Sequence, residues 1–163
     1  MKNYKLKKTS KFLLIILITF CTLTLIFWGG REIKELFTTK ETKTFEIKTD
    51  STTLNQSFIY ANNIVRSHTI SYNAKINNNA QQVKENFQNL ANRYKNISGV
   101  VVTERYNESD VLLKIDIDYK KADIEKLKNI PDLKDFFDNS NSVNIVRVGK
   151  VLINQGYSEK INT

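Results

Sequence analysis

The feature that most constrains this chain is an uncharged stretch of 19 residues, from Phe12 to Gly30, that follows a basic tail. The tail has no acidic residue and carries five lysines, at Lys2, Lys5, Lys7, Lys8 and Lys11. As a helix rising about 1.5 Å per residue, the stretch would span roughly 28 Å, close to the hydrocarbon core of a bilayer. Because burying a charge in hydrocarbon is costly, this pattern predicts a membrane-targeting segment.

Three interpretations of the segment are open: an uncleaved anchor, a cleaved secretory signal and a lipoprotein signal. Cleavage after the two glycines at its end would put a bulky aromatic residue where a small one is required. Lipidation at Cys21, the sole cysteine, would place Phe20 directly before the modified residue, where a small residue is also needed. The anchor fits better, because Trp28 lies at the expected interface and Arg31 follows the stretch. The sequence therefore favours a transmembrane signal-anchor over residues 12–30.

Charge divides the chain further. The lysine-rich residues 1–11 are predicted to stay in the cytoplasm, residues 31–43 to form a polar tether, and residues 44–163 to form an extracytoplasmic domain. Five of the 25 basic residues are in the tail, which leaves 20 against 17 acidic residues, a balance of +3. These charges are interleaved, which is typical of a solvated surface and predicts no nucleic-acid partner. The domain has no cysteine, so we expect neither a disulfide nor a thiolate-bound metal.

Alternating apolar and polar residues predict five strands in the domain, at 44–48, 54–60, 64–72, 100–106 and 111–119. Asn62 and Asn63 predict a tight hairpin between the second and third strands, because asparagine tolerates positive φ. In the third strand, the even-numbered positions from Ile64 to Tyr72 are expected to share one face.

Three helices are predicted among these strands. Apolar residues at helical spacing follow Asn79, a candidate N-cap, and Gly99 marks the exit of that helix. A short helix over Asp123–Asn129 ends before a proline. A final helix is predicted over Asn144–Gln155, with a glycine directly after it.

His68 is the sole histidine. With no cysteine in the domain, one histidine cannot build a typical zinc site, which needs three or four ligands. The expected role is that of a hydrogen-bonded, half-buried core residue.

Asp116 and Asp118 share one strand face, and Glu104 and Asp110 are near in sequence. Paired carboxylates can serve acid–base chemistry or hold a hard cation, but catalysis requires a pKa raised by burial. These two lie on the face opposite the apolar stripe, beside Lys114, so they are predicted to be solvated. No phosphate loop, dinucleotide fingerprint or EF-hand loop is present. The sequence thus predicts no catalytic, cofactor-binding or metal-binding residue.

Four stretches together resemble one known family. They are Thr42–Phe45, Tyr94–Val101, Ile115–Tyr119 running through Ala122–Leu127 to Ile130-Pro131, and Leu152–Tyr157. In this order and spacing, the chain resembles the YehR-like family of small bacterial lipoproteins of unknown function. The resemblance implies an α+β domain with a mainly antiparallel sheet packed by helices, held at the outer face of the cytoplasmic membrane. It implies no known catalytic or binding residue.

The chain departs from that family at its anchor. Family members usually carry a lipidated cysteine shortly before the first of these stretches, with a small residue in front of it. Here Cys21 lies deep in the apolar run behind Phe20, which favours a helical anchor over lipidation.

Two function classes follow from the sequence. The first is a membrane-anchored, extracytoplasmic binding or interaction module, not an enzyme, whose ligand is an unknown protein or small molecule. The alternative is a small envelope enzyme or cation-binding protein that uses Asp116 and Asp118.

Overall fold

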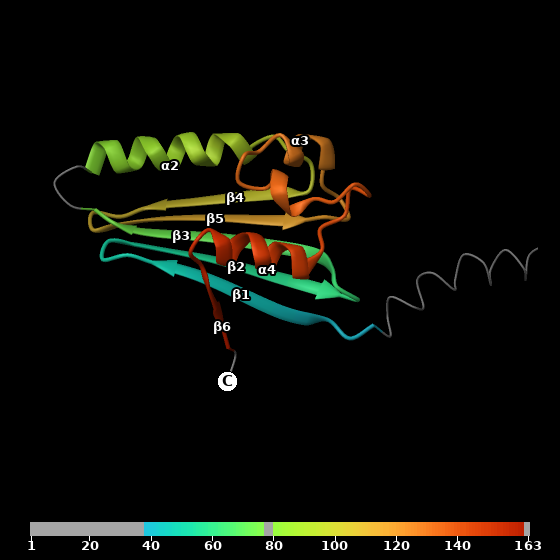
Figure 1. Cartoon of the computed structure of the whole chain (residues 1–163). Coiled ribbons are helices and arrows are strands. Elements are labelled where there is room, and N and C mark those ends of the chain that lie inside the picture. The colour runs from blue at the N-terminus through green and yellow to red at the C-terminus, as the bar shows by residue number, and fades with distance from the viewer. Residues whose placement is uncertain (1–37, 77–79, 162–163) are drawn as a thin grey trace, which may run out of the picture. The chain divides into compact units, whose positions relative to one another are not determined.

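Six strands are paired antiparallel throughout, in the spatial order β4-β5-β3-β2-β1-β6 (Figure 1). The computed structural model describes residues 38–76 and 80–161, and the sheet belongs to the second of two units, which begins at Lys40. The strands are β1 (Glu41–Lys48), β2 (Thr52–Ala61), β3 (Ile64–Lys75), β4 (Val100–Tyr106), β5 (Asp110–Asp118) and β6 (Ser158–Lys160).

The helices lie on one face of this sheet (Figure 1). They are α2 (Ala80–Tyr94), α3 (Ile124–Lys128), the short 3₁₀ helix η1 (Lys134–Phe136) and α4 (Ile145–Asn154). Phe87 of α2 meets Tyr72 of β3, with ring centroids 6.2 Å apart. Gly149 of α4 lies against Phe45 of β1, where an added Cβ would be 3.3 Å from the ring. The predicted α+β domain with an antiparallel sheet is confirmed.

The core fills the space between the sheet and the helices. Its largest fully buried side chains come from both layers: Phe45, Phe58, Ile70, Tyr94, Leu113, Ile115, Ile117, Leu127, Leu133, Phe136 and Leu152. In β5 the predicted apolar stripe is buried as expected, while the even-numbered residues point to the other face.

A β-bulge changes the predicted face of the first residues of β3. Asn62 and Asn63 adopt positive φ angles of 51° and 63°, which confirms the tight hairpin. The register with β2 then shifts: Ile59 pairs with Ser67 and Tyr60 pairs with Val65, so Arg66 is the extra residue of the bulge. The extra residue reverses the alternation, and Val65 is buried in place of Ile64. The prediction that Ile64 shares the face of His68 was therefore wrong.

The helix ends follow from local side chains. Asn144 caps α4 by accepting from the backbone N–H groups of Val146 and Arg147, at 2.9 and 3.4 Å. Asp123 caps α3, although that helix is shorter than predicted. Gly99 has a φ of 73°, and an added Cβ would lie 2.4 Å from the backbone nitrogen of Ala122, so only glycine fits there. The predicted cap Asn79 lies outside the described residues.

The two ends of the domain differ from the prediction. β1 begins at Glu41, so residues 41–43 belong to the sheet and not to the tether. β6 was not predicted, and it pairs with Thr44–Glu46 of β1 at the sheet edge. Within residues 38–76 and 80–161, no helix is long and apolar enough to cross a membrane. The predicted span at residues 12–30 and Cys21 lie outside these ranges.

Candidate functional site

The face of the sheet away from the helices is the candidate site, and we call it the open face (Figure 1). Strand alternation and register place short polar side chains over its centre. Over residues 53–59 of β2 and 67–73 of β3, seven of the eight outward residues carry a hydroxyl or an amide: Thr53, Asn55, Ser57, Ser67, Thr69, Ser71 and Asn73, with Ile59 as the exception. The flanking strands add Thr42, Thr44 and Glu46 from β1, Leu112, Lys114, Asp116 and Asp118 from β5, and Val101, Thr103 and Arg105 from β4.

Register aligns these side chains in rows across the strands. In one row, Thr44, Ser57, Thr69 and Asp116 are successive cross-strand neighbours. The Thr44 hydroxyl donates to the Ser57 hydroxyl at 3.1 Å, and the Thr69 hydroxyl donates to Asp116 Oδ1 at 2.7 Å. Short hydroxyl side chains supply both donors and acceptors. The row can therefore exchange its hydrogen bonds with polar groups of a partner.

The structure places Asp116 and Asp118 on the open face, as predicted, but in separate ion pairs. Lys114 Nζ lies 2.8 Å from Asp116 Oδ2, and Lys121 Nζ lies 3.3 Å from Asp118 Oδ2. Partial burial would raise the pKa of Asp116, but the hydrogen bonds from Lys114 and Thr69 outweigh burial and lower that pKa below its ordinary value. A carboxylate of this kind stays ionised at neutral pH. Asp116 therefore lacks the raised pKa that a general acid requires.

The other two acidic residues near them in sequence lie elsewhere. Glu104 points to the helix side of β4, where Lys95 Nζ is 2.6 Å from its Oε1. Asp110 accepts a hydrogen bond from the side chain of Asn107 in the β4–β5 turn, at 2.7 Å. No group of three or more His, Cys, Asp or Glu side chains in the described part of the chain is arranged to hold a metal ion.

His68 is more buried than predicted. Its relative exposure is 1%, and its ring stacks on Phe58 with centroids 4.1 Å apart. Gln56 donates through Nε2 to the hydroxyl of Tyr157, so its Oε1 is free to accept from His68 Nε2 at 3.0 Å. The hydroxyl of Tyr119 lies 3.4 Å from the other ring nitrogen. Burial lowers the pKa of His68 to about 3, so the ring is neutral at physiological pH.

This chain of hydrogen bonds gives His68 a structural role. The predicted hydrogen bonding is confirmed, but the side chain is fully buried and not half-buried, because Phe136 also packs on it with ring centroids 6.0 Å apart. A neutral ring enclosed by aromatic side chains cannot reach a ligand. His68 therefore belongs to the core and not to a site.

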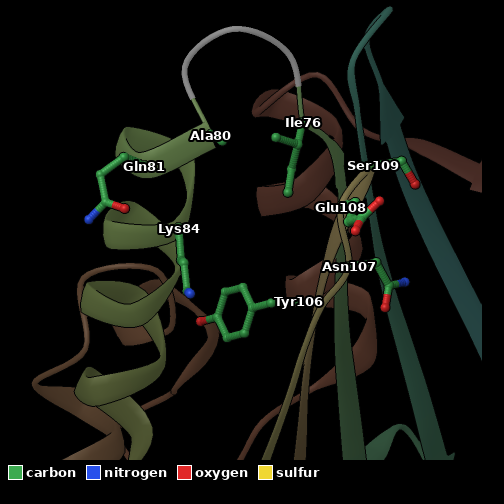
Figure 2. A pocket seen from close by; sticks show the side chains of 8 residues that line it. All are labelled: Ile76, Ala80, Gln81, Lys84, Tyr106, Asn107, Glu108 and Ser109. Atoms are coloured by element: carbon green, nitrogen blue, oxygen red, sulfur yellow. The ribbon is translucent and has the colours of Figure 1, made fainter.

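A cleft lies at the end of the sheet where α2 begins (Figure 2). Its volume is about 770 Å³, and it is lined by Ile76, Ala80, Gln81, Lys84, Tyr106, Asn107, Glu108 and Ser109. The ammonium of Lys84 lies 5.2 Å from the centroid of the Tyr106 ring. Burial, followed by a hydrogen bond to Glu104, raises the pKa of Tyr106 to about 12. The lining holds no nucleophile with an adjacent base, so it suits binding of a small polar molecule better than chemistry.

Sequence reasoning found the carboxylates of the open face but missed the face as a whole and the cleft. The signal for the face was present, since Ser, Thr or Asn recurs at every second position from 53 to 57 in β2 and from 67 to 73 in β3. The cleft joins a helix start to a distant turn, and no local pattern marks it.

Comparisons with known proteins agree with this architecture. An uncharacterised lipoprotein of Listeria innocua is 21% identical over 124 residues, which cover 74% of this chain and 81% of that protein. The NMR structure of the Escherichia coli YehR protein matches with a TM-score of 0.64 at 17% identity, covering 78% of this chain and 95% of YehR. A Streptococcus pneumoniae protein solved by NMR matches with a TM-score of 0.53 at 14% identity, covering 76% and 87%.

The two solved structures establish the fold alone. The family assignment rests on a match over residues 41–158, from the first strand to the start of the last. The chain therefore belongs to the family described as "Protein of unknown function (DUF1307)". The predicted resemblance to the YehR-like family is confirmed, since a relative is a lipoprotein and the YehR protein shares the fold.

Proposed function

We propose that this protein is a membrane-anchored, extracytoplasmic module that binds a partner in the bacterial cell envelope through the open face. The observation that carries the proposal is the composition of that face. Hydroxyl and amide side chains cover its centre, and its carboxylates Asp116 and Asp118 are already neutralised by lysines. Such a surface offers many hydrogen bonds at little cost in side-chain entropy, because Ser, Thr and Asn are short.

The anchor in this proposal is a single uncleaved span over residues 12–30, with the lysine tail inside and the domain outside. The uncharged stretch and the five lysines support it. The lipoprotein relative supports attachment at the membrane, and Cys21 would be the attachment point if the chain were lipidated instead. Intact-mass measurement of the membrane-extracted protein separates these routes. We expect the mass of the full chain, whereas a chain that begins at Cys21 with added acyl mass would contradict the span.

Binding through the open face can be tested by photo-cross-linking in intact cells of the organism that carries the gene. A photoreactive amino acid would replace Ser71, at the centre of the open face, or Asn92, on the exposed side of α2. We expect a discrete cross-linked product of higher mass at Ser71 and none at Asn92. Products at neither position, or the same product at both, would contradict binding through this face.

A further inference from the structure

Strand β4 forms a sheet edge that has no strand beside it among the described residues. The hydrogen bonds at its two ends show which peptide groups are free. Asp118 N–H donates to the carbonyl of Gly99, and Asn107 N–H donates to the carbonyl of Asp110, at 2.9 Å in each case. Antiparallel pairing alternates, so the odd-numbered residues of β4 bond to β5. The N–H and C=O groups of Val102, Glu104 and Tyr106 therefore point away from the sheet.

At the opposite edge of the sheet, next to β1, a short extended segment already pairs as an added strand. β6 adds to β1 over only three residues, and ion pairs support it on both faces. Lys43 Nζ lies 3.0 Å from Glu159, and Lys160 Nζ lies 2.7 Å from Glu46. A short segment is thus fixed in register by backbone bonds together with opposite charges.

Three side chains around the β4 edge are exposed or form no ion pair within the part of the chain that the structure describes. Val101, on the open face, is 62% exposed. Arg105 on the same face and Lys84, above the Tyr106 ring on the helix face, form no ion pair with any residue in the ranges 38–76 and 80–161. The nearby carboxylate of Glu104 is already held by Lys95. Each face of the edge therefore carries one cationic side chain, Lys84 or Arg105, that forms no ion pair with a described residue.

We propose that the β4 edge binds an extended, acidic segment of another protein as a seventh, antiparallel strand. Backbone groups of Val102, Glu104 and Tyr106 bond the segment. Acidic side chains of the segment pair with Lys84 and Arg105, and an apolar side chain covers Val101. This inference rests on the proposed function and names the chemistry of the partner.

A labelled peptide on the full-length chain in detergent tests this. The probe is fluorescein-Asp-Glu-Thr-Thr-Val-Val, whose residues would lie opposite positions 106 to 101 in an antiparallel register. We expect saturable binding by fluorescence anisotropy, and loss of binding for the charge-reversed peptide Lys-Arg-Thr-Thr-Val-Val. Bound peptide should slow amide hydrogen exchange at Val102, Glu104 and Tyr106, whereas Thr103, already bonded to β5, should not change.

Glu104→Pro removes one free N–H of the edge and no bond of the sheet, so we expect binding to weaken about tenfold or more. Glu104→Gln keeps the N–H and is the matched control, expected to bind like the parent. If Glu104→Pro melts well below the parent, the pair Lys84→Glu and Arg105→Glu serves instead. That double variant should lose the acidic peptide and gain the basic one.

Absence of saturable binding, or equal binding by Glu104→Pro and its control, would overturn the proposal. So would self-association of the chain that Glu104→Pro abolishes, because the edge would then belong to a second copy. These outcomes are separable from failure of the proposed function, since cross-linking from Ser71 does not depend on the peptide.

Discussion

The two faces of the sheet carry the same strands but opposite chemistry. On the helix face, Phe45 and Phe58 are fully buried, and a neutral histidine is enclosed among aromatic rings. On the open face, Ser57 and Thr69 form hydrogen bonds through their hydroxyl groups, and Asp116 forms an ion pair with Lys114. Period-two alternation produces both faces from one sequence. Burial of large apolar side chains is concentrated on the helix face. We therefore expect the helix face to dominate folding, and the residues of the open face to be free to serve binding.

The largest effect on folding is expected when a side chain at the centre of the helix face is truncated. Phe58 is fully buried and contacts Phe45, His68 and Phe136. Phe58→Ala should lower the free energy of unfolding by about 3–5 kcal/mol, measured by denaturant titration of the chain. A loss below about 1 kcal/mol would mean that the two faces do not differ in their role in folding.

Lowering the pH should also reduce the free energy of unfolding, through His68 on the helix face. His68 has a folded-state pKa of about 3, against an ordinary value near 6.5, so below pH 6.5 the unfolded state binds a proton that the folded state does not. The contribution of neutral His68 is present above pH 6.5 and is lost as pH falls toward 3. Between pH 6.5 and 4.5 the loss should be about 2–3 kcal/mol. A His68→Asn variant should lack this part of the pH dependence, and an equal slope in parent and variant would contradict it.

A substitution at the periphery of the core should lower the free energy of unfolding by an intermediate amount. Phe87 of α2 is half-buried and contacts Tyr72 edge-on. Its partial exposure makes Phe87→Ala less damaging than Phe58→Ala, with an expected loss of about 1–3 kcal/mol. A loss equal to that of Phe58→Ala would place Phe87 in the core proper.

Substitutions on the open face should change the free energy of unfolding the least. Thr69→Ala removes the hydroxyl that donates to Asp116, and Ser71→Ala provides a matched change with no such bond. Each should alter the free energy of unfolding by no more than about 0.5 kcal/mol. NMR titration should place the pKa of Asp116 below that of a free aspartate, and Thr69→Ala should raise it. An Asp116 pKa above the ordinary value would reopen the enzyme alternative.

The sequence predicts the elements whose signals are local. Alternation located β2, β3, β4 and β5, and the helices predicted over Asp123–Asn129 and Asn144–Gln155 correspond to α3 and α4. The two asparagines predicted the β2–β3 hairpin, because asparagine tolerates the positive φ that such a turn requires.

The features that the sequence does not predict depend mainly on contacts between residues far apart in the chain. β6 is three polar residues with no alternation of their own, and it exists because β1 offers an edge more than 100 positions earlier in the chain. The bulge at Arg66 inserts one residue into an otherwise regular pattern, so counting from Ile64 assigns the wrong face. Full burial of His68 requires Gln56, Phe58 and Phe136, which come from other elements.

We have proposed that the open face lies outside the cytoplasm and is covered by a partner. Cysteines introduced by Ser71→Cys on the open face and by Asn92→Cys on α2 can be labelled with a membrane-impermeant maleimide, and the parent chain, which carries only Cys21, gives the background. We expect labelling without cell lysis at both positions. Relative to purified protein, labelling in cells should slow at position 71 and stay unchanged at position 92. Equal rates at position 71 in cells and in purified protein would contradict coverage by a partner. Labelling only after lysis would contradict a location outside the cytoplasm.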